Sequence, residues 1–351
     1  MPGTEPDGHG QIASADFPIP PTSDSTNVTA ALSRGEQSER VMDEIILHHY
    51  PQSPVSEKVR VGLGIKRLAW RSVIIPRLPP KPDLVPLSGG YRRTPVMQIG
   101  ADVYCDSQCI LRELEARFPE PTFYPGGAAG MVWGVSRWTD GELFDLAIRL
   151  VLGAAADELP EDFARDRGRL YLGPEWDFAK VKADLPHIVA QLRVQFGWMD
   201  QRLATGRAFM LGEEPGLPDA LGYYLVWLIR GRWQEGPRFL SQFPSLEVWE
   251  RRVKLIGHGN PTDMDPGEAL ETARAAEPST VEAVDPGDPQ DLAPSMSVTV
   301  VPEGDGGDPM VAGTVRRVDR ETIAILHDDP RVGTVCIHFP RSGYRVTVAG
   351  N

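Results

Sequence analysis

The period of the hydrophobic pattern changes along this chain of 351 residues, and that change limits the possible folds more than any other feature. Residues 43–125 mix apolar runs of strand length with helical spacing, whereas residues 126–257 show helical spacing alone. In residues 296–351, apolar residues alternate or form β-branched runs between turn signals. Residues 1–42 are rich in Pro, Gly, Ser and Thr and are predicted to be a disordered leader. Residues 258–295 are predicted to be a linker with one short helix, GEALETARAA.

The first structured region has the element order β-α-β-loop-β-β-α. Its strands are predicted at EIILHH, LAWRSVII, TPVMQIG and ADVYCD, and its helices at VSEKVRVGLGI and SQCILRELEARF. A βαβ unit followed by a hairpin and a helix is the layout of an α/β thioredoxin-like domain. The next region is predicted to be an all-α domain, and the last one a small antiparallel sheet or barrel.

One apolar stripe dominates the predicted all-α domain. Its members, each three or four residues apart, are Phe178, Val181, Leu185, Ile188, Leu192, Phe196, Met199 and Leu203. Pro186 lies inside this stripe and predicts a kink or a restart of the helix, because proline cannot donate a backbone hydrogen bond.

Charge and composition exclude several classes of partner. The net charge of −13 disfavours nucleic acid and anionic membranes, since both would repel the protein. No apolar run reaches the roughly 20 residues that a membrane span needs, and no signal-peptide pattern precedes residue 43. Three cysteines are too few to stabilise a chain of this length by disulfide bonds. We therefore expect the protein to lie in a reducing cytoplasm.

Three separated segments place polar groups at one edge of the predicted sheet. Ser53 and Pro54 precede the first helix, Thr94-Pro95 is a candidate cis peptide, and Asp106-Ser107 begins the next helix. A Ser-Pro pair alone is more often only a helix cap. The convergence of all three segments favours a binding site for a small polar ligand.

With these motifs in this order, the chain resembles the glutathione S-transferase (GST) superfamily over residues 44 to about 257. The resemblance rests on YPQSPVSEKVRVGL, RRTPVMQIG and YCDSQCI, followed by the helical region. It implies glutathione as co-substrate and Ser53 as the residue whose hydroxyl stabilises the glutathione thiolate. Tyr50 is the alternative, because tyrosine-type members use a phenol near this position. Packing in the core is the simpler role for Tyr50.

The resemblance also implies how the rest of glutathione binds. Val96, after the expected cis-Pro95, matches the residue whose backbone pairs with the cysteinyl unit. Asp106 and Ser107 match the pair that holds the γ-glutamyl group. For the glycyl carboxylate, the resemblance leaves two candidates, Lys81 or Arg93.

The electrophilic substrate is expected in an apolar pocket of the helical region. Trp133, Arg137, Trp138 and Phe144 are the candidate lining residues, although the aromatic ones can equally be ordinary core residues. Serine at position 53 cannot form the mixed disulfide that cysteine-type members use. No His or Cys spacing indicates a metal site, and Cys105 and Cys109 are expected to be small buried side chains.

The sequence therefore predicts a cytoplasmic glutathione transferase, which the resemblance implies is a homodimer. It would activate the glutathione thiolate for attack on an electrophilic small molecule. Two alternatives stay open, a non-catalytic scaffold with this fold and a glutathione-dependent isomerase. The role of the β-rich tail stays open as well, between covering the pocket, assembly and partner binding.

Overall fold

The computed structural model describes residues 44–304 and 306–349, so the predicted leader, residues 1–42, lies outside the described residues. The helices are α2 (Pro54–Ile65), α3 (Val85–Ser88), α4 (Ser107–Arg117), α5 (Ala129–Asp140), α6 (Glu142–Ala154), α7 (Glu161–Leu172), α8 (Phe178–Ala183), α9 (Leu185–Leu203), α10 (Leu217–Arg232), α11 (Gly236–Leu240), α12 (Pro244–Ile256) and α13 (Pro266–Arg274). The strands are β1 (Ile46–His49), β2 (Ala69–Ile74), β3 (Val96–Ile99), β4 (Asp102–Cys105), β5 (Asn260–Asp263), β6 (Ala283–Val284), β7 (Ser297–Pro302), β8 (Val311–Val318), β9 (Thr322–Asp329), β10 (Gly333–Pro340) and β11 (Tyr344–Val348).

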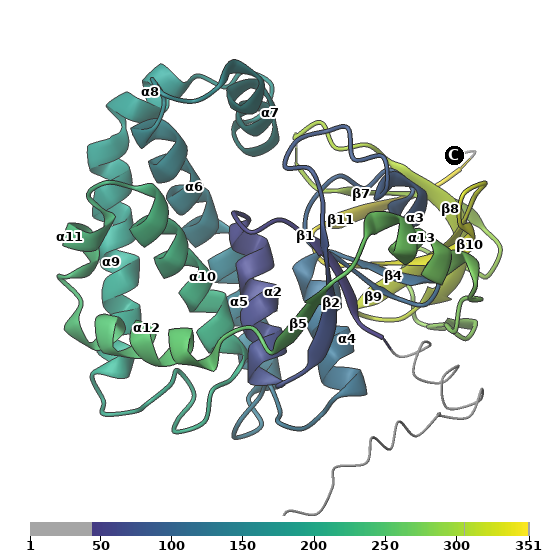
Figure 1. Ribbon diagram of the computed structural model, residues 1–351, viewed down its shortest axis with the longest axis horizontal. Helices are drawn as coiled ribbons and strands as arrows, with labels where there is room; N and C mark the ends of the chain where they lie inside the picture. Colours follow the sequence, from purple (N-terminus) through teal and green to yellow (C-terminus); the bar gives the residue numbers. More distant parts are fainter. Residues whose placement is uncertain (1–43, 305, 350–351) are drawn as a thin grey trace, which may run out of the picture.

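The thioredoxin-like fold predicted for the first region is confirmed. Strand β1 pairs in parallel with β2 through the crossover helix α2, and antiparallel with β3, which forms a hairpin with β4. The apolar residues of these short strands are almost completely buried, which explains why their sequences are runs rather than alternations. Figure 1 shows the helical region on one side of this sheet and the β region on the other.

The antiparallel β region at the C-terminal end is also confirmed, and it extends the thioredoxin-like sheet. Strand β10 pairs in parallel with β4, with Cys336 opposite Asp102, so the strand order is β11-β7-β8-β9-β10-β4-β3-β1-β2-β5. At the opposite edge, β5 pairs in parallel with β2. Residues 258–295, predicted as a linker, therefore contain the expected helix, α13, and also contribute strands to the sheet.

A buried polar cluster holds the joint between β4 and β10. Asp102 accepts hydrogen bonds from the Ser279 backbone at 2.8 Å and from the Thr280 hydroxyl at 2.6 Å, and His338 lies 2.9 Å from the same carboxylate. These partners hold the pKa of Asp102 well below its usual range. With Cys336, this group brings together residue types that can bind metal ions, but the carboxylate oxygens already have protein partners.

The helical region confirms the predicted apolar stripe and its interruption. Helix α8 ends at Ala183 and α9 begins at Leu185, with Pro186 in its first turn. Asp219 of α10 is completely buried and accepts hydrogen bonds from the Gly216 and Met210 backbone amides. Among the helices of the described ranges, none is long and apolar enough to cross a membrane.

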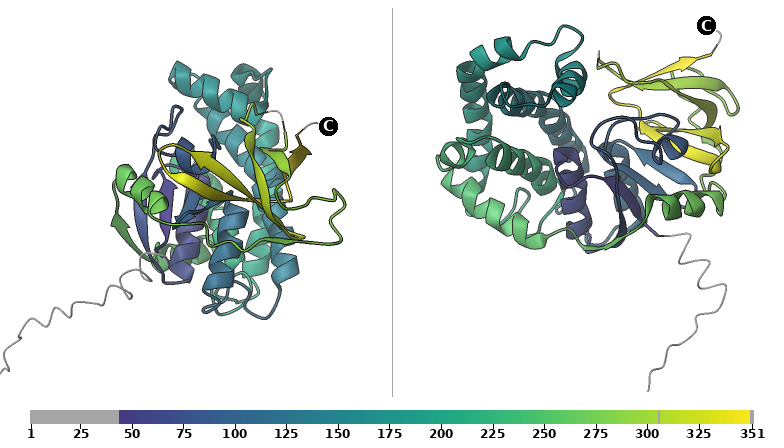
Figure 2. Two further views of the ribbon diagram at one scale, coloured as in Figure 1. Left: turned by 90° about the vertical axis from the view of Figure 1, so that its right-hand side faces the viewer. Right: turned by 45° about the horizontal axis from the view of Figure 1, so that its top comes forward.

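One buried ion pair fixes the helical region against the thioredoxin-like sheet. Helix α2 packs against α10, and Lys58 of α2, only 1% exposed, donates to Asp140 of α5 at 2.6 Å. The Tyr224 hydroxyl of α10 lies 3.0 Å from the same carboxylate and 2.8 Å from the Thr139 carbonyl, either of which can accept its proton. Figure 2 shows α2, in purple, beside the helices of the helical region. Because Ser53 caps the start of α2, this packing sets the distance between Ser53 and the helical region.

Candidate functional site

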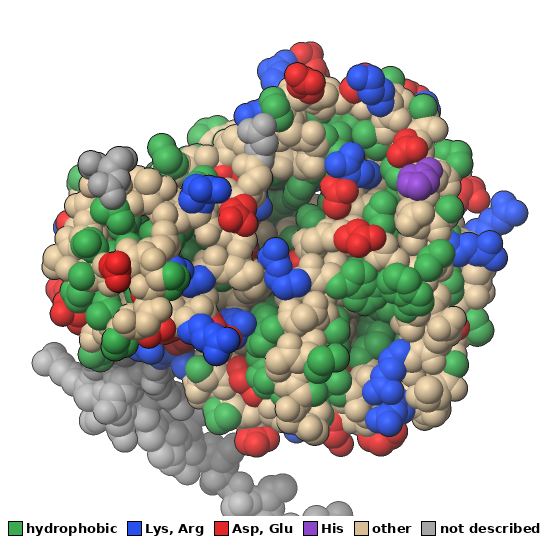
Figure 3. Space-filling model, turned by 180° about the vertical axis from the view of Figure 1, so that it is seen from behind, with side chains coloured by type: hydrophobic (Ala, Val, Ile, Leu, Met, Phe, Trp, Pro, Cys, Tyr) green, Lys and Arg blue, Asp and Glu red, His purple; other side chains and the backbone are tan. Residues whose placement is uncertain are grey.

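A cavity of about 310 Å³ lies where the thioredoxin-like, helical and β regions meet. Figure 3 shows a hollow between the β region and the helical region, with both basic and acidic side chains around its rim. The thioredoxin-like region lines the cavity with the start of α2, the loop before β3 and the start of α4. Six Lys or Arg residues line it against three Asp or Glu residues, and three of these cations pair with Asp166 or Asp308, which do not line the cavity.

Ser53 lines the cavity as the cap of α2. Its Oγ accepts a hydrogen bond from the Ser56 backbone N–H at 3.1 Å, and the residue is 2% exposed. A serine hydroxyl has one proton to donate besides its acceptor lone pairs. Within residues 44–304 and 306–349 no acceptor takes that proton, which leaves it available to a ligand beside the positive end of α2.

The cis-proline is present, but the residue next to it in the cavity differs from the expected one. The Thr94–Pro95 peptide is cis, and both residues line the cavity. Val96 does not line it, because it is fully buried and paired with β1 on one side and β4 on the other. Val96 therefore contributes no side chain to the cavity, and its expected backbone contact with the cysteinyl unit stays a prediction. The backbone at Thr94, which does line the cavity, is a second candidate for that contact.

Asp106 and Ser107 line the cavity at the start of α4. Asp106 accepts from the Gln108 backbone N–H at 2.8 Å and caps the helix. Its φ of 74° with ψ of 140° is a conformation that residues other than glycine rarely adopt. Strained backbone of this kind persists where the surrounding structure enforces it, often at a binding site.

Two tyrosines connect Asp106 to the β region. The Tyr344 hydroxyl donates to Asp106 at 3.0 Å and lies 2.9 Å from the Tyr91 hydroxyl. Burial raises the pKa of both phenols well above the usual value, so both stay protonated. Since Tyr344 spends its single proton on Asp106, Tyr91 is the donor to Tyr344. The β region thus orients the Asp106 carboxylate.

Lys81 is a buried cation without a carboxylate partner among the described residues. Its Nζ donates to the Arg92 carbonyl at 2.8 Å and to the Thr94 hydroxyl at 2.7 Å. Burial, with smaller contributions from Arg167 and Arg92, lowers the pKa of Lys81 to about 7. A bound anion would favour its charged form.

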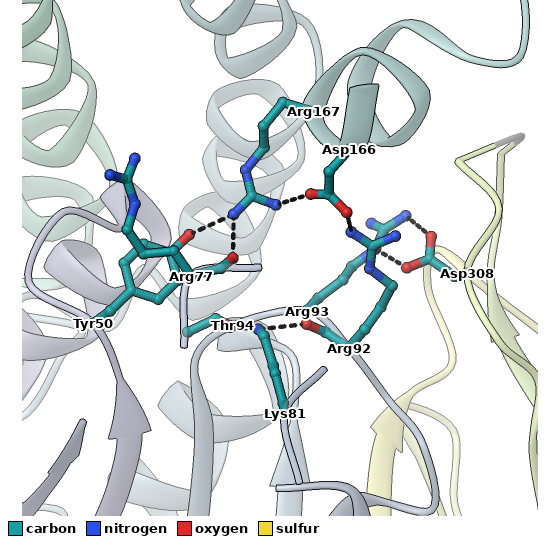
Figure 4. A network of polar contacts seen from close by, with 9 residues as sticks. All are labelled: Tyr50, Arg77, Lys81, Arg92, Arg93, Thr94, Asp166, Arg167 and Asp308. Atoms are coloured by element: carbon teal, nitrogen blue, oxygen red, sulfur yellow. Dashed lines mark hydrogen bonds and ion pairs between the residues drawn. The ribbon is translucent and has the colours of Figure 1, made fainter. Parts of the chain in front are cut away.

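A network of arginines forms the upper wall of the cavity (Figure 4). Asp166 pairs with Arg167 at 2.7 Å and also with Arg92. Arg167 donates in addition to the Arg77 carbonyl at 2.6 Å and to the Tyr50 hydroxyl at 3.3 Å. Tyr50 therefore lines the cavity with its hydroxyl, while its ring belongs to the hydrophobic core.

Arg93 lines the cavity but is bound to the β region. Its guanidinium makes two hydrogen bonds with the Asp308 carboxylate, at 2.6 and 3.1 Å. Such a two-point contact is among the stronger ionic contacts in proteins. Of the two candidates for the glycyl carboxylate, Lys81 is thus the one that has no acidic partner among the described residues.

The helical wall contains only two of the four predicted lining residues, Arg137 and Phe144. The Trp133 ring lies under the Arg112 guanidinium at 3.8 Å, beside α4. Trp138 donates from Nε1 to Gln195 at 2.6 Å and faces α9. Neither tryptophan lines this cavity. Trp138 instead lines a second cavity of about 320 Å³ inside the helical region, with Val132 and Trp198 among its neighbours. The expected role of the two tryptophans in a substrate pocket therefore stays a prediction.

Comparisons with known proteins identify the family. Residues 47–122 match the family model described as "Glutathione S-transferase, N-terminal domain". A GST-like protein from Pseudomonas syringae, solved by crystallography, is 35% identical, with a TM-score of 0.70 over 87% of this chain and 100% of that one. The chain belongs to the glutathione S-transferase superfamily. A glutathione S-transferase from Rhodospirillum rubrum F11 is 21% identical, with a TM-score of 0.46 over 60% of this chain and 87% of that one. No curated protein matches the chain.

The match with the Pseudomonas syringae protein includes the β region. Residues 1–295 are about 84% of the chain, so a match over 87% of it has to extend into the β region. This GST-like protein and the present chain therefore share more than the two regions that carried the resemblance.

Sequence reasoning missed the residues that complete this GST-family cavity. Tyr344 and Glu303 come from the β region, and Arg167 and Tyr171 come from α7. The alternation in YRVTV predicted a strand, but no local signal indicates that this strand lies beside the start of α4. Cys105 and Cys109 are buried as predicted, and burial raises the pKa of both thiols.

Proposed function

We propose that this member of the GST superfamily binds glutathione in the cavity and activates its thiolate for attack on an electrophilic small molecule. One observation carries the proposal, the convergence of Ser53, Thr94-Pro95 and Asp106-Ser107 on a single cavity beside the helical region. Substitution and addition at the electrophilic carbon are both compatible with this arrangement.

Ser53 is proposed to stabilise the thiolate. A thiol with a pKa of about 8.5 is mostly protonated at pH 7. The free Ser53 proton and the positive end of α2 both favour the charged sulfur. The thiol proton has by then passed to solvent, and the sulfur forms a bond to the electrophilic carbon. In a substitution the leaving group departs with the bonding electron pair, and in an addition the neighbouring atom that receives the electron pair takes a proton from solvent. Tyr50 is the alternative donor, with its hydroxyl already in contact with Arg167.

The charged groups of glutathione have complementary partners along the cavity wall. We infer that Asp106 takes the α-ammonium group and that the first amides of α4, at Ser107, take the neighbouring carboxylate. Lys81 is proposed for the glycyl carboxylate, in preference to Arg93, whose guanidinium is already paired. The backbone at Thr94 is proposed to pair with the cysteinyl unit.

Calorimetry with glutathione and an assay with 1-chloro-2,4-dinitrobenzene test the proposal together. We expect a dissociation constant below about 1 mM and conjugation faster than the uncatalysed reaction. Absence of binding at 10 mM, measured by calorimetry and by thermal shift, would overturn the proposal.

A non-catalytic scaffold is the second candidate, and one observation favours it. The Tyr344 hydroxyl already binds the Asp106 oxygen that faces the β region. If this contact replaces the ligand rather than orienting the carboxylate for it, the protein keeps the fold without binding glutathione. The calorimetric titration separates the two functions.

We also propose a cytoplasmic location and a homodimer, in line with the superfamily. The outer edge of β4 is occupied by β10, so a dimer of this chain cannot pair through that edge. Light scattering during gel filtration, at micromolar protein, distinguishes a dimer from a monomer.

A further inference from the structure

The charge balance of the cavity points to a property of the second substrate. Most cations of the cavity wall already have oxygen partners from the protein. The ion pairs are Lys58 with Asp140, Arg92 and Arg167 with Asp166, and Arg93 with Asp308. Lys81 is held by two neutral oxygens.

Arg137 differs from these cations. It lies in the last turn of α5, is exposed to solvent and lines the cavity. In the part of the chain that the structure describes, no carboxylate lies within 4.0 Å of its guanidinium. Gly343, with φ of 86°, lies close to this guanidinium. A Cβ atom at position 343 would be 3.2 Å from Nη1 of Arg137. The guanidinium therefore lies against the turn before β11, between the helical and β regions.

The surroundings of Arg137 carry charges of both signs. Arg137 lies in the last turn of α5, where the partial negative charge of the helix end favours a cation. Gly141, which also lines the cavity, precedes α6, and the first turn of α6 carries Glu142 and Asp145. Three aromatic residues also line the cavity, Phe144, Tyr171 and Tyr224. The centroid of the Phe144 ring lies 5.8 Å from that of Tyr171 and 6.0 Å from that of Tyr224.

Glutathione, bound as proposed above, leaves Arg137 unused. Its ammonium group faces Asp106, and its two carboxylates face the start of α4 and Lys81. Those partners belong to the thioredoxin-like region, whereas Arg137 belongs to the helical region across the cavity. A cation on that side is available to the electrophile.

We propose that the electrophilic substrate is a carboxylate-bearing molecule, whose carboxylate pairs with Arg137 while its electrophilic carbon faces the sulfur at Ser53. This inference rests on the proposed function. The planar guanidinium matches the two oxygens of a carboxylate, and the three rings cover the carbon skeleton. In a substitution, the sulfur–carbon bond forms, and the leaving group departs as an anion with the bonding electron pair.

A matched pair of electrophiles tests the inference, 4-chloro-3,5-dinitrobenzoate and its carboxamide. Thiolate replaces chloride in both, and only the charge of the remote group differs. For the full chain we expect the ratio of kcat/KM, acid over amide, to exceed the ratio of the uncatalysed rate constants about tenfold. Arg137→Gln should remove that preference, and Arg137→Lys should restore part of it. Arg193→Gln, an exposed position on α9 outside the cavity, is the matched control and should keep it.

The outcomes separate this inference from the proposed function. Turnover of both compounds without a preference for the acid overturns the inference alone. An equal loss of kcat/KM for the acid and the amide in Arg137→Gln would also overturn the inference. Weaker binding of glutathione in that variant would do the same, because either result assigns Arg137 to glutathione. If neither compound turns over and glutathione does not bind, the proposed function fails, and this inference fails with it.

Discussion

Replacing Ser53 by glycine should slow conjugation at low pH and leave it unchanged or faster at high pH. A hydrogen bond to a charged group contributes about 1.5–3 kcal/mol, and 1.36 kcal/mol corresponds to one pKa unit. Loss of the Ser53 hydroxyl should thus raise the pKa of the bound thiol by about one to two units. The more basic thiolate is also more nucleophilic, with a Brønsted coefficient of about 0.4–0.5. The net loss of rate at pH 6 is then about three- to tenfold.

Glycine is the better replacement because Ser53 also caps α2. Its Oγ accepts from the Ser56 amide, so Ser53→Ala should lower the free energy of unfolding by about 1 kcal/mol. Glycine caps a helix nearly as well and should cost only a few tenths. Both variants should show the same rate loss despite their different stability, which separates the chemical role of the hydroxyl from its structural one.

The assay is kcat/KM for 1-chloro-2,4-dinitrobenzene at saturating glutathione, measured from pH 6 to 9.5. An unchanged profile in Ser53→Gly would refute the role of Ser53 and turn attention to Tyr50. A loss of equal size at every pH would refute the thiolate argument in particular, because it would indicate misplaced substrates rather than a raised thiol pKa.

Three further predictions follow from the contacts of the site and the core. The pKa of Lys81 is about 7, and its charged form would bind a carboxylate. The affinity for S-methylglutathione, measured by calorimetry, should therefore fall about tenfold between pH 6.5 and 8.5. The Lys81→Met variant should show no such fall. Tyr344→Phe should raise the dissociation constant for glutathione about fivefold, with kcat little changed. It should also destabilise the fold, because the Tyr91 hydroxyl loses its partner. The double variant with Tyr91→Phe should recover stability in urea unfolding without recovering affinity for glutathione. Asp219→Ala should cost about 3–5 kcal/mol in urea unfolding, because three buried donors lose their acceptor, and a loss below 1 kcal/mol would contradict this account.

The parts of the site that could be predicted from the sequence are those set by neighbours along the chain. Ser53 and Pro54 form a local signal for the start of a helix, and Asp106 with Ser107 forms another. Pro95, before a short buried strand, is local as well. In each case the cap, the turn or the strand period depends on a few adjacent residues.

What could not be predicted concerns the directions of side chains, which the period of a helix or strand leaves open. Val96 was assigned to the ligand through its backbone, and only the structure shows that strands on both sides bury its side chain. Trp133 and Trp138 lie on the predicted helix α5, but α4 and α9 decide which of its sides is covered. A period identifies the faces of an element and does not identify what packs against each face.

The sequence by itself determined the order of elements, the helix starts that supply Ser53 and Ser107, and the existence of a β-rich end. Only the tertiary structure decided that β10 joins the edge of β4 and brings Tyr344 to Asp106, more than 200 residues away along the chain. Pairing of distant strands depends on which edges and apolar faces are free after the rest has packed. Local spacing carries no information about that choice, so the third wall of the cavity became visible only in the folded molecule.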